Sequence, residues 1–123
     1  SLNQFIFLTL NLETKSDEPA YYTNRAIAYL KLDNFQGAMD DCKAALRIDE
    51  KFAKAYNRMS KCYIALGNLT EASFALQKSI ELEPNNQVNK KDQKHLGDLK
   101  IIEKLISNAY DQGNYDKAVT NLT

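Results

Sequence analysis

Three residues of this chain could together bind an anionic ligand: Asn24, Lys54 and Arg58. Lys54, Arg58 and Lys61 follow one another at spacings of four and three residues, which places their side chains on one face of a helix. Like charges at these spacings repel one another, so the stability of an isolated helix does not favour this arrangement. A negatively charged ligand would favour it.

These donor groups suit a chain terminus that carries several carboxylates. Arg58 can bind a carboxylate through two parallel hydrogen bonds, whereas Lys54 acts as a point charge. The amide of Asn24 can donate to a carboxylate or to a peptide backbone. Lys61 and Asn57 are predicted as additional contacts. In the alternative interpretation the cations are solvated and Asn24 bonds to its own turn of backbone.

A repeat of 34 residues predicts the elements that position these side chains. Asn24 and Arg58 are 34 residues apart, so we expect them at equivalent sites on neighbouring helices, facing one groove. A period between 20 and 50 residues is typical of stacked repeats, which bind other proteins on extended surfaces. Small residues recur with this period where helices would cross closely, with aromatic residues beside them. The matching pairs are Tyr22/Tyr56, Ala26/Ser60, Tyr29/Tyr63, Ala38/Ala72 and Ala45/Ser79.

Apolar residues at spacings of three and four predict helices throughout. We expect helices over residues 19–32, 35–48, 53–66, 69–82 and 87–111. Gly67 suits the left-handed residue that ends a helix, and Pro84 follows the last helix of its unit. The fifth helix is charged and unusually long, with Gly97 as its weak point.

We therefore predict a single all-α domain, a right-handed superhelix of helix–turn–helix units. Its parts are a partial repeat (1–18), two repeats (19–52 and 53–86), and an extended helix with a last partial repeat (87–123). Because the first unit lacks its opening helix, an apolar face would be left uncovered. We expect either a neighbouring molecule, such as a second copy, on this face or poor order at the N-terminus. The face comprises Phe5, Leu8 and Leu12.

The composition argues against several kinds of partner. Sixteen basic and sixteen acidic side chains cancel, whereas proteins that bind nucleic acid or anionic membranes normally carry a basic excess. No stretch approaches the roughly 20 apolar residues that span a bilayer. Cys42 and Cys62 resemble small core residues of a protein in a reducing compartment, so we expect free thiols and a cytosolic or nuclear location.

Catalytic chemistry has no support in the sequence. His95 is the only histidine, and it lies on a charged helix without a candidate partner. Asp40 and Asp41 are predicted to be exposed on the back of their helix. Neither a glycine-rich phosphate loop nor a nucleophile with a nearby base is present. We therefore expect no enzyme activity, no metal and no cofactor.

The spacing of Tyr22, Ala26, Tyr29, Ala38 and Ala45, repeated one period later, resembles the tetratricopeptide repeat family. Glu50 departs from the family pattern, since a proline like Pro84 is usual there. The runs Tyr21–Ala26 and Lys54–Arg58 are similar to co-chaperone repeats that bind the free carboxyl end of cytosolic heat-shock chaperones. The long charged helix further resembles J-domain co-chaperones with several repeats, although the chain has no His-Pro-Asp tripeptide.

This resemblance implies that Asn24, Lys54 and Arg58 form a clamp for an acidic C-terminal tail. The family also uses a Lys and an Asn from a preceding helix that this chain lacks, so we expect weak binding. Two other hypotheses remain. The chain could be an architectural segment of a larger assembly without a peptide clamp, or an accessory region of an enzyme whose catalytic domain lies elsewhere.

Overall fold

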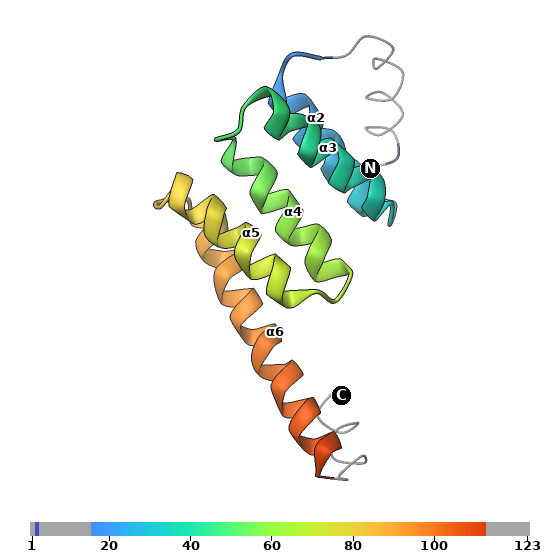
Figure 1. Ribbon diagram of the computed structural model, residues 1–123, viewed down its shortest axis with the longest axis vertical. Helices are drawn as coiled ribbons and strands as arrows, with labels where there is room; N and C mark the ends of the chain where they lie inside the picture. Colours follow the sequence, from blue (N-terminus) through green and yellow to red (C-terminus); the bar gives the residue numbers. More distant parts are fainter. Residues whose placement is uncertain (1, 3–15, 113–123) are drawn as a thin grey trace.

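The computed structural model describes Leu2 and residues 16–112, and the part from residue 16 onward is a succession of α-helices (Figure 1). The predicted apolar face of Phe5, Leu8 and Leu12 lies outside the described residues, as does the part of the last partial repeat beyond residue 112. No β-strand occurs among the residues described. The helices are α2 (Pro19–Lys31), α3 (Phe35–Ile48), α4 (Ala53–Ala65), α5 (Leu69–Leu82) and α6 (Gln87–Asp111).

The helices pack as antiparallel pairs stacked in chain order. Helix α2 pairs with α3, and α4 pairs with α5, while α4 also contacts both helices of the preceding pair. Helix α6 packs on α5 and then continues past the α4–α5 pair, as Figure 1 shows. The predicted all-α solenoid of helix–turn–helix units is confirmed, and so is the single long helix after the second complete pair.

The two turns within the pairs are nearly identical, because their residues recur with the 34-residue period. Gly67 adopts the predicted left-handed conformation (φ 76°), and Asp33 adopts it at the equivalent place in the first pair (φ 57°). The next residue, Asn34 or Asn68, uses its side-chain oxygen to cap the following helix. A left-handed residue followed by an asparagine cap therefore reverses the chain in both units.

Small residues hold the helices close together, as predicted. All six members of the three small-residue pairs are at most 2% exposed: Ala26, Ala38, Ala45, Ala72, Ser60 and Ser79. Cys42 of α3 and Cys62 of α4 lie in one core cluster with Ala26 and Ala38, and both thiols are free. The core is therefore continuous across the boundary between the two pairs.

One prediction about the surface was wrong. Asp41 is buried rather than exposed, because Arg25 of α2 binds its carboxylate. The Arg25 Nε donates to Oδ2 of Asp41 at 2.6 Å, and Nη2 donates to the second carboxylate oxygen. The guanidinium also lies 5.9 Å from the ring centre of Tyr22 and 5.3 Å from that of Tyr29. Burial raises the pKa of Asp41, and Arg25 opposes that rise.

Candidate peptide-binding site

The 34-residue period brings one position of each first helix to an equivalent place in the stack. This position holds Asn24 in α2, Arg58 in α4 and Asp92 in α6. We call these three residues, with Lys54 and Lys61 of α4, the charged row. Its chemistry changes along the stack from an amide through three cations to an acid.

The centre of the row is a small pocket of about 80 Å³ where α4, α5 and α6 meet. Lys54 and Arg58 line it from α4, so the structure brings together two of the residues predicted to bind the ligand. Lys54 is exposed, whereas Arg58 is partly buried. The other lining residues are Asn57, Ser79, Glu83, Asn86, Val88 and Asn89.

Asn57 also lines this pocket, but its amide is already hydrogen-bonded to α6. Its side chain is only 3% exposed, and its amide nitrogen donates to Oδ1 of Asn89 at 3.0 Å and to Oδ2 of Asp92 at 2.8 Å. Asn89 also accepts a hydrogen bond from the Ser79 hydroxyl at 3.2 Å. A buried amide with these partners joins α4 to α6 and holds the walls of the pocket together.

Arg58 depends on Asn57 for its orientation. Its Nη1 donates to Oδ1 of Asn57 at 2.9 Å. Burial lowers the pKa of Arg58, and the nearby carboxylate of Asp92 acts in the opposite direction. A guanidinium titrates so far above neutral pH that the side chain keeps its charge. Among the described residues, its Nε is buried without a hydrogen-bond partner, so the cation is not fully satisfied within the chain.

Lys61 and Asn24 lie at the two sides of this centre. The Lys61 ammonium is 3.5 Å from Oδ2 of Asp92, so the predicted contact residue already has an acidic partner. Asn24 is exposed on α2 and is not among the residues that line the pocket. Because α2 and α4 pack against each other, a ligand would have to extend along the stack to reach both Asn24 and Arg58.

Sequence reasoning missed Asn89 and Asp92. The signal for Asp92 was available, since it follows Arg58 by one period and therefore had to join the same row. Asn89 gives no such signal, because an asparagine on a charged helix is usually exposed. Its burial follows from the packing of α6 on α5.

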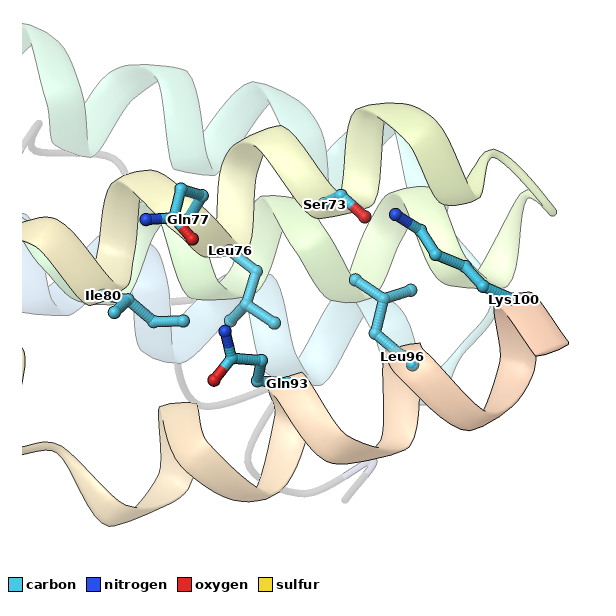
Figure 2. Close-up of a pocket in the computed structure, with 8 residues that line it drawn as sticks. Ser73, Leu76, Gln77, Ile80, Gln93, Leu96 and Lys100 are labelled. Carbon is cyan, nitrogen blue, oxygen red and sulfur yellow. The ribbon is translucent and has the colours of Figure 1, made fainter.

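A second groove, of about 240 Å³, lies between α5 and α6 (Figure 2). Leu76 and Leu96 point into the space between the two helices, and Lys100 extends from α6 toward Ser73. Only one cation lines this groove, so it offers less to an acidic ligand than the charged row does.

The described residues hold no cluster of three or more His, Cys, Asp or Glu side chains suited to a metal ion. Within residues 16–112, no helix combines the length and the apolar character that a membrane-spanning segment needs.

Known proteins are similar to this chain in sequence and in fold. The chain is 40% identical over 80 residues to the small glutamine-rich tetratricopeptide repeat-containing protein 2 of Mycosarcoma maydis, covering 65% of this chain and 23% of that protein. It is 28% identical over 100 residues to human DnaJ homolog subfamily C member 7, covering 81% and 20%. The chain thus spans less than a quarter of the length of these relatives.

One similar solved structure is the first tetratricopeptide domain of Spaghetti (RPAP3) bound to the HSP90 peptide SRMEEVD. It has 30% sequence identity and a TM-score of 0.68, and the match covers 79% of this chain and 77% of that one. The sequence profile described as "Tetratricopeptide repeat" matches residues 24–90, more than half of the chain. This protein belongs to the tetratricopeptide repeat family.

Proposed function

We propose that this chain is a co-chaperone-like interaction module that binds the acidic C-terminal tail of a heat-shock chaperone. The observation that carries the proposal is the joint placement of Lys54 and Arg58 in one pocket. The similarity to a domain bound to the peptide SRMEEVD supports the same ligand class.

Each residue has a distinct task in this proposal. Arg58 binds a carboxylate through its guanidinium, and Lys54 supplies a second charge at the open side of the pocket. Asn24 donates its amide to the ligand one repeat earlier in the stack. Asn57 acts as a positioning residue, because its buried amide holds Arg58 and is not exposed to a ligand.

We further propose how the module acts, where it works and what kind of longer protein contains it. The module acts by binding, without a catalytic step of its own, and works in the cytosol, where its ligand would be available. The parts 1–18, 19–52, 53–86 and 87–123 form one domain. The similarity to DnaJ homolog subfamily C member 7 supports a parent protein of the co-chaperone class.

A titration of fluorescently labelled SRMEEVD tests this function. We expect Lys54→Ala and Arg58→Lys each to weaken binding by about 10-fold or more, since a charge-assisted contact contributes about 1.5–3 kcal/mol. Arg58→Lys keeps the charge but removes the planar pair of donors, so its effect reports bidentate binding. Thermal unfolding of each variant shows whether the fold is retained.

Two controls make the result specific. Lys43→Ala removes an exposed lysine of α3 outside the charged row and should leave binding unchanged. A peptide with an amidated C-terminus should bind more weakly than the free acid. Equal binding of both peptides, or unchanged binding by both the Lys54 and Arg58 variants, would rule out the clamp.

The exposed apolar residues of α6 favour a second candidate, an architectural scaffold segment in a larger complex without a clamp. Ile101, Leu105 and Tyr110 are 60%, 51% and 60% exposed, which suits a contact with another protein. This function predicts that substitutions of these residues disrupt assembly of the complex while substitutions in the charged row do not. Co-purification of the parent complex with each set of variants separates the two candidates.

A further inference from the structure

The end of the charged row is acidic, which is unexpected in a groove for an acidic ligand. Asp92 stands one period after Arg58 and is held in place by two contacts with α4. Its Oδ2 accepts a hydrogen bond from Asn57 at 2.8 Å and lies 3.5 Å from the Lys61 ammonium. We propose that Asp92 is an internal competitor for the cations of the row and limits the affinity of the site for acidic chain termini.

This inference rests on the proposed function, and the contacts of Asp92 carry it further. The Asp92 carboxylate forms an ion pair with Lys61 and accepts a hydrogen bond from the amide of Asn57. Asn57 in turn orients Arg58. Asp92 therefore already occupies Lys61, one of the cations that a ligand carboxylate would use. The Asp92 side chain is 24% exposed, so water and salt screen its charge less than they would at an open surface.

An incoming acidic ligand would feel Asp92 in two ways. Its carboxylates would have to displace Asp92 from Lys61 to use that cation, and Asp92 would repel those bound at Arg58. Both effects oppose binding. The row then favours a ligand whose negative charges are concentrated at Lys54 and Arg58, because charges placed nearer α6 meet an acid.

The substitution Asp92→Asn isolates the charge. The asparagine side chain has nearly the same shape and retains an oxygen that can accept the hydrogen bond from Asn57. A structural defect in the pocket would weaken binding, whereas removal of a competitor strengthens it. The direction of the change therefore distinguishes the proposed role from a merely structural one.

The test uses the full 123-residue chain and fluorescently labelled SRMEEVD at low salt, about 50 mM. Asp92→Asn should tighten binding by about 3- to 10-fold, and the gain should shrink at high salt, about 500 mM, where charges are screened. Asp98→Asn is the matched control, since it makes the same change in net charge at an exposed site of α6 outside the row. It should change affinity by less than about 2-fold.

Each outcome decides between the two proposals. If the unmodified chain binds the peptide through Lys54 and Arg58 but Asp92→Asn binds it equally or more weakly, the role of Asp92 is refuted and the proposed function stands. An equal gain from Asp98→Asn also refutes it, because net charge alone then explains the change. If neither the unmodified chain nor Asp92→Asn binds the peptide, both proposals fail. If Asp92→Asn binds the peptide and the unmodified chain does not, both the role of Asp92 as a competitor and the binding of acidic chain termini are supported.

Discussion

The buried pair of Arg25 and Asp41 allows a stringent test of the energetics of the first repeat. One period later the equivalent residues are Met59 and Ala75, so the second repeat fills the same place without charges. We predict that Arg25→Met strongly destabilises the protein, and that adding Asp41→Ala to it restores most of the stability. The double variant copies the apolar solution already present in the chain.

The expected magnitude follows from the burial of the pair. The side chain of Asp41 is 4% exposed and that of Arg25 is 13% exposed, so removal of Arg25 leaves an uncompensated carboxylate in the core. Losses of this kind amount to about 3–5 kcal/mol in the free energy of unfolding. Replacement of a whole buried pair by apolar residues often changes stability little. The free energy of unfolding of the double variant should therefore lie within about 1 kcal/mol of that of the unmodified protein.

Urea denaturation followed by circular dichroism measures these free energies at several pH values. Burial raises the pKa of Asp41, and the loss of Arg25 removes the interaction that opposes the rise. The folded state of Arg25→Met then binds a proton more readily than the unfolded state does. The loss of unfolding free energy in Arg25→Met should therefore be largest at neutral pH and should shrink as the pH falls toward the raised pKa of Asp41.

Two results would refute this reasoning. A cost below about 1 kcal/mol for Arg25→Met would mean that Asp41 finds water or another partner when Arg25 is absent. Additive effects of the two substitutions would mean that the residues do not interact energetically. The variant Asp40→Ala is the control, because this neighbouring carboxylate is exposed. It should change stability by less than about 0.5 kcal/mol.

Two further predictions concern the backbone and the core. Gly67→Ala should lower the free energy of unfolding by about 1 kcal/mol, because φ there is 76°. Gly97→Ala should raise it by a similar amount, since a Cβ at this helical position meets nothing within 4 Å; equal effects of the two substitutions in urea denaturation would contradict this. Cys42 and Cys62 are fully buried, so a thiol reagent should label them only as fast as the protein opens. Immediate labelling of the native protein would contradict their placement.

The helices were predictable because every local signal agrees with the 34-residue period. Gly67, the small residues at the helix crossings and the apolar spacing all depend on backbone geometry that recurs in each unit. The conformation of Asp33 was less accessible, since aspartate enters the left-handed region only in a context that favours it. Its position one period before Gly67 was the available clue.

The side-chain partners were harder to predict than the helices. Arg25 and Asp41 are 16 residues apart on different helices, and sequence periodicity does not report which polar groups meet across a helix pair. Asn57 was predicted as an additional contact for the ligand, but its hydrogen bonds to α6 required the fold. The row of Asn24, Arg58 and Asp92 was predictable in position, whereas the ion pair of Asp92 with Lys61 required the fold.

Helix α6 also has a mechanical consequence. It has 25 residues, compared with 13 in α4, and the additional twelve correspond to about 18 Å of rigid rod. The chain that follows Gln112 therefore starts well away from the pocket of Lys54 and Arg58. Helix α6 would therefore hold a tail bound at that pocket at a fixed distance from any structure joined to the far end of the helix.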